Sequence, residues 1–168
     1  MAKREVYLIE GARTAFGEFG GSFKDVTAID LAAACARKAM EKSNVSPEEI
    51  DQVVIGNVIQ SSPDAVYTGR HVGLKSGVPK HVPGLTVNRL CGSGLQAIIS
   101  AAQSILLGEA DLALAGGAEN MSQVPHVIRG ARWGYSAWQS SHGGLFVGDA
   151  LRSLWRLHDG DHCRKPGR

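Results

Sequence analysis

Short runs of apolar, often β-branched residues alternate with helix-like segments along the chain, and this alternation constrains the fold most strongly. The runs lie at residues 52–59, 85–88 and 111–117, and a further strand is expected at residues 6–10. Apolar residues recur at helical spacing over residues 28–39 and 95–107, and residues 69–76 are a further helix-like segment. Strands that alternate with helices form largely parallel sheets whose two faces are covered by helices. The sequence therefore predicts an α/β fold with a mostly parallel mixed sheet covered by helices on both faces.

The predicted helices have clear start and stop signals. Thr27 with Asp30 three residues later is typical of an N-terminal capping box. A second box, with proline at the first helical position, lies at residues 46–49. Gly108 follows the apolar pattern of residues 95–107 and is expected to be its C-terminal cap. These ends fix where the helices lie between the strands.

The chain of 168 residues has the size of one domain and a formal charge of only +2. So small a charge argues against nucleic acid or an anionic membrane surface as the partner, and no apolar run is expected to reach the length of a membrane span. Charged residues near the start argue against a signal peptide. The three widely spaced cysteines do not form a disulfide framework. We therefore expect a protein of the cytoplasm.

Residues 87–95 place a cysteine in a turn between a predicted strand and a predicted helix. Cys91 is followed by Gly92 and Gly94, which let the backbone turn sharply and let a substrate approach. Unpaired N–H groups at a helix N-terminus favour a thiolate and can hold an oxyanion. A thiolate in that setting is suited to acyl transfer, whereas most free cysteines are small buried residues. From the residues alone, both interpretations stay open.

The segment around Cys91 resembles the nucleophile motif of the thiolases, the acetyl-CoA acyltransferases. Other blocks that resemble this family occur in the family's order, from about residue 5 to residue 135. They are Gly11-Ala-Arg-Thr, Ile55-Gly-Asn-Val-Ile-Gln60, Thr86-Val-Asn-Arg89 and Ala115-Gly-Gly-Ala-Glu-Asn-Met-Ser122. The resemblance implies the N-terminal half of a thiolase-like fold.

The resemblance also implies an activity and a set of site residues. Thiolases cleave a 3-oxoacyl-CoA with free CoA or join two acyl-CoA molecules, so acyl-CoA and CoA are the expected substrates, with no cofactor and no metal. Cys91 is then the catalytic residue that becomes acylated. The glycines expected to be structural near the site are Gly92, Gly94, Gly116 and Gly117. The residues expected to bind substrate or, more commonly, to shape its pocket are Asn120, Met121 and Ser122.

Two alternatives to an active thiolase stay open. One is a related condensing enzyme that makes ketides or fatty acids. The segment around Cys91 and the block at residues 115–122, however, look more like those of thiolases. The other is a catalytically inactive, truncated remnant that acts at most as a binding or interaction module. The resemblance implies that the family's second half carries a histidine that activates the nucleophile and a second cysteine that moves protons. It also implies a homo-oligomer, but a chain without that half is expected to expose apolar faces and to aggregate or associate.

Residues 136–168 show no helix or strand period and no resemblance to the family. Combining the last two bases of each codon with the first base of the next permits DSLWEMLSDPYGDCTMAITAENLG over residues 144–168, which resembles thiolase sequence. We therefore expect a thiolase-like domain at residues 1–135, followed by a non-family tail that is out of frame and poorly ordered. The alternative is a divergent surface loop. His158, His162 and Cys163 in this tail lack the spacing of metal ligands.

Three other residues that could suggest chemistry have a structural explanation. Cys35 lies on the apolar face of the first predicted helix, where a core role is expected. Arg13 and Arg70 are expected to be ion-pair partners rather than phosphate ligands.

Overall fold

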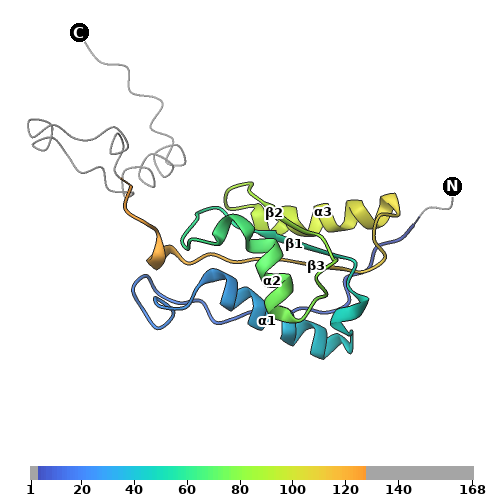
Figure 1. Ribbon diagram of the computed structural model, residues 1–168, viewed down its shortest axis with the longest axis horizontal. Helices are drawn as coiled ribbons and strands as arrows, with labels where there is room; N and C mark the ends of the chain where they lie inside the picture. The colour runs from blue at the N-terminus through green and yellow to red at the C-terminus, as the bar shows by residue number, and fades with distance from the viewer. Residues whose placement is uncertain (1–3, 128–168) are drawn as a thin grey trace, which may run out of the picture. The chain divides into compact units, whose positions relative to one another are not determined.

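The structure is a computed structural model that describes residues 4–127. Its three-stranded sheet has the order β2-β1-β3, and both strand pairs are parallel (Figure 1). The strands are β1 (Gln52–Gly56), β2 (Gly84–Val87) and β3 (Ala113–Gly117). The predicted α/β fold with a parallel sheet is confirmed, because each strand lies within or beside a run that the sequence marked out.

Helices cover both faces of this sheet, as expected. They are α1 (Ala28–Ser43), α2 (Thr68–Ser76) and α3 (Ser93–Leu107). α1 and α2 pack on one face, whereas α3 packs on the other (Figure 1). The chain crosses the sheet in one direction from β1 to β2 and returns past β1 to reach β3. Because parallel crossovers share one hand, these opposite directions place α2 and α3 on opposite faces.

The core consists of two layers that meet at the central strand β1. Val53 and Ile55 face α1 and α2, whereas Val54 faces Ala97 and Ala101 of α3. This division follows from the two-residue repeat of a strand. The other buried residues on the α1–α2 face are Ile29, Ala36, Met40, Ile50, Val72, Val78 and Val82. Small alanines on α3 let this helix lie close to the sheet.

The start of α1 confirms Thr27 as the N-cap, but the Asp30 carboxylate bonds to the Thr27 hydroxyl and not to the Thr27 backbone N–H of a full capping box. The hydroxyl oxygen of Thr27 accepts a hydrogen bond from the Asp30 backbone N–H at 3.1 Å and donates one to the Asp30 carboxylate at 2.7 Å. A capping hydroxyl satisfies a helix N–H group that otherwise has no partner within the helix. The cap at residues 46–49 is also present and opens the short 3-10 turn Pro47–Glu49.

The variant Thr27→Ala is expected to lower the free energy of unfolding by about 1 kcal/mol, because it removes the acceptor for the Asp30 N–H. Urea unfolding followed by circular dichroism measures the loss. Ser22→Ala is the control, since the Ser22 hydroxyl has no hydrogen bond in the described part of the chain. Equal stability of the two variants would contradict the assigned cap.

Asp51 ties the start of β1 to the segment that leads into β3. Its carboxylate accepts hydrogen bonds from the backbone N–H groups of Asp111 and Leu112, each at 2.9 Å. These two bonds, that from Leu112 first, hold the pKa of Asp51 below its ordinary value of 3.8. The carboxylate form is therefore bound more tightly in the folded chain than the protonated form.

The variant Asp51→Asn is expected to be less stable than the wild type at neutral pH, with a difference that shrinks in acid. Because the pKa is lowered on folding, the stabilisation by Asp51 is complete above pH 3.8 and is lost as the pH falls through the folded-state pKa. Urea unfolding at a series of pH values measures both chains. A difference that stays constant into strong acid would contradict this assignment.

Residues 6–10 correct one expectation, because the structure shows no strand there. A strand requires a neighbour with which its backbone groups pair, and none of the three described strands pairs with this segment. Tyr7, Leu8 and Ile9 are 74%, 84% and 61% exposed. The apolar run therefore has no regular secondary structure, and its three largest side chains are exposed among the described residues.

Helix α3 corrects a second expectation. By length and composition alone, Leu90–Leu107 is apolar enough to cross a membrane, although no run of that length was expected. The alanines that face the sheet raise the apolar content of a helix whose other face also carries leucines. Leu95 and Leu107 on that other face are exposed. Apolar side chains are thus present at the described surface.

Candidate active site

The three parallel strands end at one edge of the sheet. Gly56 at the end of β1 pairs in register with Val87 of β2 and with Gly117 of β3. The loops that follow therefore leave the sheet side by side. In open α/β sheets, ligands bind outside the carboxyl ends of the strands. This edge is the candidate site.

Cys91 lies at this edge, in the turn between β2 and α3 that the sequence predicts. Cys91 is exposed, and α3 begins two residues later at Ser93. The residue before it, Leu90, has a φ of 50° in the left-handed region. That conformation costs a residue with a side chain about 1–2 kcal/mol. Such strain persists only where neighbouring groups hold it, which is typical of active sites.

The start of α3 keeps backbone donors free beside Cys91. The N–H groups of Gly92 and Ser93 donate to the carbonyl oxygens of Arg89 and Leu90 at 3.1 and 3.0 Å. Within the described residues, no hydrogen bond uses the N–H groups of Gly94 and Leu95, the next two along the helix. Free N–H groups at a helix N-terminus favour negative charge on a nearby sulfur or oxygen atom.

Close packing of α3 against the strand ends depends on glycines. A Cβ atom on Gly56 would lie 2.4 Å from the carbonyl carbon of Ser93, and one on Gly117 would lie 3.0 Å from the Cα atom of Gly94. Any side chain at Gly56 would therefore push the first turn of α3 off the sheet. Gly56 lies within a block that resembles the thiolases, but no local pattern in the sequence indicates this packing role.

The other two glycines expected near the site behave differently. At Gly116 a Cβ atom would meet no atom within 4 Å, so close packing does not explain a glycine there. At Gly92 it would meet only the Arg89 carbonyl oxygen, at 3.4 Å. Gly92 is the residue that caps α3, and it brings no side chain to the helix N-terminus.

Glu119 links the loops that follow β1 and β3. Its carboxylate accepts hydrogen bonds from the backbone N–H groups of Val58 at 2.9 Å and Ile59 at 3.2 Å, and from the Asn57 side chain at 3.1 Å. The Asn57 amide also donates to the Ala118 carbonyl oxygen at 3.0 Å. This carboxylate thus holds one wall of the site in place, a role that the sequence did not reveal.

The next three residues serve chiefly to position a neighbouring segment. The buried Asn120 amide donates to two carbonyl oxygens within residues 20–26, at 2.9 and 2.7 Å. The Ser122 hydroxyl accepts a hydrogen bond from a backbone N–H of the same segment at 2.9 Å, while Met121 is exposed. These bonds favour the pocket-shaping role, and substrate contact by Asn120, Met121 or Ser122 stays a prediction.

A hollow of about 220 Å³ opens at the carboxyl ends of β1 and β2. Its walls come from the loop after β1, from the 3-10 turn Ala65–Tyr67 and from the end of β2. Asn57 and Val58, which Glu119 holds, line it, as does Asn88 at the start of the turn that carries Cys91. The hollow and the cysteine therefore share one edge of the sheet.

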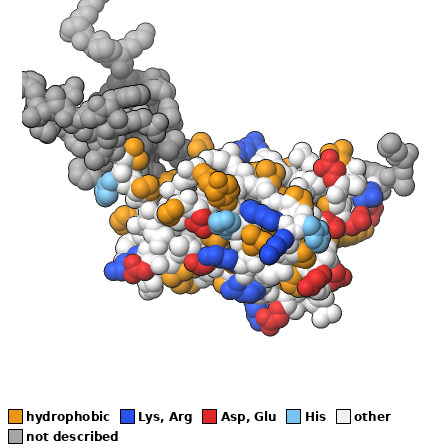
Figure 2. Space-filling view, viewed as in Figure 1, with side chains coloured by type: hydrophobic (Ala, Val, Ile, Leu, Met, Phe, Trp, Pro, Cys, Tyr) orange, Lys and Arg blue, Asp and Glu red, His pale blue; other side chains and the backbone are white. Residues whose placement is uncertain are grey.

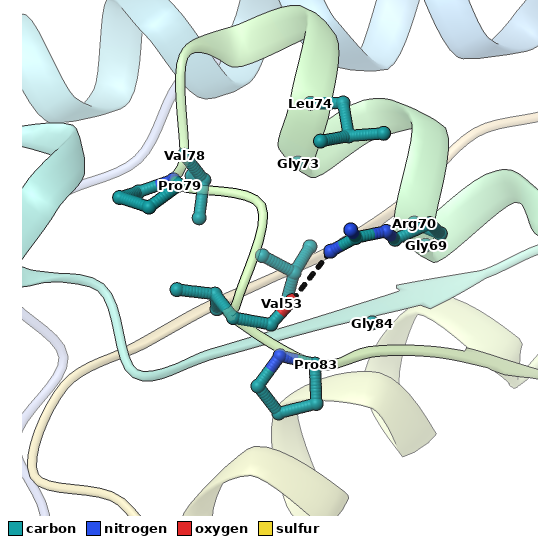
Figure 3. Close-up of a pocket in the computed structure, with 10 residues that line it drawn as sticks. Val53, Gly69, Arg70, Gly73, Leu74, Val78, Pro79, Pro83 and Gly84 are labelled. Carbon is teal, nitrogen blue, oxygen red and sulfur yellow. Dashed lines mark hydrogen bonds between the residues drawn. The ribbon is translucent and has the colours of Figure 1, made fainter.

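A second crevice, between α2 and the segment before β2, is packing rather than a site (Figure 3). It has no space for a water molecule. Arg70 at its side donates to the carbonyl oxygens of Val82 at 2.7 Å and Lys80 at 2.6 Å. Arg13 likewise donates to the Thr14 carbonyl oxygen, with its guanidinium over the Phe16 ring.

These contacts correct the expectation that Arg13 and Arg70 form ion pairs. Arg13 and Arg70 are structural, as expected, but their partners within residues 4–127 are carbonyl oxygens and a ring instead of carboxylates. Cys35 is half-buried on α1, less enclosed than the core position that was expected. His158, His162 and Cys163 lie outside the described residues, and residues 4–127 hold no group of three side chains suited to a metal ion.

Charged side chains of both signs are interspersed on the face shown in Figure 2. Among the described residues, Lys75 forms an ion pair with Asp30 at 2.7 Å, and His71 contacts Asp64 at 2.8 Å. Hydrogen bonds from His71 first and Ser62 second hold the pKa of Asp64 below its ordinary value. No face dominated by one sign of charge is visible in this view, in keeping with the small net charge.

Comparison of the sequence with known proteins identifies the family of this chain. The family model described as "Thiolase, N-terminal domain" matches residues 6–162. The chain is 47% identical to beta-ketothiolase BktB of Cupriavidus necator over 157 residues, which are 94% of this chain and 40% of that protein. It is 50% identical to the mitochondrial 3-ketoacyl-CoA thiolase of Homo sapiens over 131 residues, 78% of this chain and 33% of that protein.

Two solved structures of similar enzymes have a fold similar to that of this chain. The human mitochondrial 3-ketoacyl-CoA thiolase in complex with CoA superposes with a TM-score of 0.75 at 42% identity, covering 90% of this chain and 42% of that one. For the acetyl-CoA acetyltransferase of Bacillus anthracis, the TM-score is 0.72 at 33% identity, covering 90% of this chain and 41% of that one.

The chain spans less than half the length of these relatives. The boundary expected at residue 135 stays a prediction, since the family match runs on to residue 162 and residues 128–168 lie outside the described part. The solved structures support the α/β fold with a parallel sheet described above. The chain belongs to the thiolase family and carries the family's N-terminal domain.

Proposed function

We propose that this chain accepts an acyl group from a CoA thioester onto Cys91. The observation that carries the proposal is the position of Cys91, exposed in a strained turn at the start of α3, in a chain of the thiolase family. The free N–H groups of Gly94 and Leu95 and the nearby hollow add to it. That the human relative was crystallised with CoA supports CoA thioesters as the substrates.

In the proposed step, the sulfur of Cys91 attacks the carbonyl carbon of the acyl thioester. A bond forms between this sulfur and the acyl carbon, the bond from the acyl carbon to the CoA sulfur breaks, and CoA leaves as a thiol after taking up the proton that Cys91 gives up. The oxyanion of the tetrahedral intermediate needs hydrogen-bond donors near Cys91. The acyl group then returns to CoA or passes to a second acyl-CoA.

The proposal for this chain is limited to acylation of Cys91, because the relatives are more than twice as long. Full turnover in either direction requires a base for the nucleophile and a proton donor, which the resemblance assigns to the second half of the family's fold. Groups that act as a unit lose most of their effect when one is missing. We propose the cytoplasm as the place of the reaction, because three widely spaced cysteines fit a reducing compartment. We also propose association with further copies through the exposed side chains of α3.

Incubation of the chain with acetyl-CoA, followed by intact mass spectrometry, tests the proposal. The expected result is the addition of one acetyl group, which excess free CoA removes again. Reversal by CoA separates a thioester on cysteine from acetylation of lysine, because an amide does not exchange with a thiol. An unmodified chain, or an adduct that CoA leaves in place, would remove the support for this function.

A further inference from the structure

Ser93 is the first residue of α3, and its hydroxyl points back into the turn that precedes the helix. A serine at the N-cap normally accepts a hydrogen bond from one of the free N–H groups of the first turn. Here the N-cap is Gly92, which has no side chain, so no side chain caps the start of α3.

The two hydrogen bonds of this hydroxyl lie on either side of the strained residue Leu90. The hydroxyl oxygen accepts a bond from the Arg89 backbone N–H at 2.8 Å and donates one to the Leu90 carbonyl oxygen at 2.6 Å. The Ser93 backbone N–H donates to the same carbonyl oxygen at 3.0 Å. These contacts fix the peptide unit that joins Leu90 to Cys91.

Ser93 is itself held firmly against the sheet. It is only 4% exposed, and its backbone lies where a Cβ atom on Gly56 would be 2.4 Å away. The end of β1 therefore sets the position of Ser93, and the Ser93 hydroxyl sets the peptide before Cys91. That peptide places the N and Cα atoms of Cys91, because both atoms lie in its plane.

We propose that Ser93 is a positioning residue that aims the Cys91 sulfur at the acyl carbon of the substrate. This inference rests on the proposed acylation of Cys91. Nucleophilic attack requires a defined approach to the carbonyl, and a displacement of about 1 Å can slow such a step by about a hundred-fold. A small, freely diffusing alkylating agent needs no such alignment with the protein.

The test compares two reactions of Cys91 in the full chain. Initial rates are measured for acetylation by acetyl-CoA and for alkylation by iodoacetamide, both by mass spectrometry of the peptide that contains Cys91. In Ser93→Ala, acetylation is expected to slow by about ten- to a hundred-fold, while alkylation stays close to the wild-type rate. Ser93→Thr keeps the hydroxyl and is expected to restore most of the acetylation rate.

Ser104→Ala is the matched control, since this hydroxyl lies on the same helix and, among residues 4–127, bonds only to the Ser100 carbonyl oxygen, at 3.3 Å. It is expected to leave both rates unchanged. Equal slowing of both reactions in Ser93→Ala, loss of its fold by circular dichroism, or no rescue by Ser93→Thr would overturn the inference. An acetylation rate in Ser93→Ala equal to that of the wild type would overturn it while leaving the proposed function intact. Failure of the wild type to acetylate would instead overturn the proposed function.

Discussion

Substitution of Cys91 by alanine is expected to abolish reversible acetylation of this chain by acetyl-CoA. The sulfur is the proposed acceptor, and no neighbouring group replaces a thiolate as the nucleophile in thioester exchange. Cys91 is exposed, so its replacement leaves the buried core unchanged. Intact mass spectrometry after incubation with acetyl-CoA, before and after addition of free CoA, measures the loss.

Cys35→Ala is the matched control for this loss. Cys35 is the other cysteine within residues 4–127, and it is half-buried on α1. This helix covers the face of the sheet opposite α3. The control variant is expected to acetylate like the wild type, because its sulfur is not at the carboxyl edge of the sheet. A Cys91→Ala chain that still gains a CoA-reversible acetyl group would refute Cys91 as the acceptor.

Substitution of Gly56 by alanine is expected to destabilise the fold by about 3 kcal/mol, the upper end of what an overpacked core costs. The added methyl group would lie 2.4 Å from the Ser93 carbonyl carbon and 2.5 Å from its oxygen. Both atoms belong to backbone that cannot rotate away as a side chain does. The start of α3 must therefore shift, and Cys91 shifts with it, so acetylation is expected to fall together with stability.

Gly116→Ala provides the matched comparison. Gly116 lies in β3 and pairs with Ile55, whereas the next residue, Gly117, pairs with Gly56. A methyl group there meets no atom within 4 Å, and replacing glycine within a strand lowers the entropy of the unfolded chain. This variant is expected to be as stable as the wild type or slightly more so. Urea unfolding of both variants measures the difference, and equal stabilities would contradict the packing described for Gly56.

Local signals in the sequence predicted much of the fold. The caps at Thr27 and at residues 46–49 involve partners only three residues apart, so the sequence itself contains both members of each pair. The strand runs were equally clear, because β1 is central and both of its faces are buried. The turn that carries Cys91 was predicted from one short segment, since the strand, the glycines and the helix follow one another directly.

Contacts between distant segments were not predictable in this way. Glu119 finds its partners in the loop after β1, about sixty residues earlier, and no local pattern marks such a pair. The role of Gly56 likewise depends on where α3 passes over the sheet. Residues 6–10 show the reverse error, because an apolar run with strand-like composition is a strand only where a neighbour pairs with it.

A crystal structure of the chain after incubation with acetyl-CoA shows directly whether Cys91 is the acyl acceptor. The expected result is an acetyl group bonded to the Cys91 sulfur, with its carbonyl oxygen within hydrogen-bond distance of backbone N–H groups at the start of α3. An unmodified Cys91, together with an acetyl group on another side chain or on none, would contradict it.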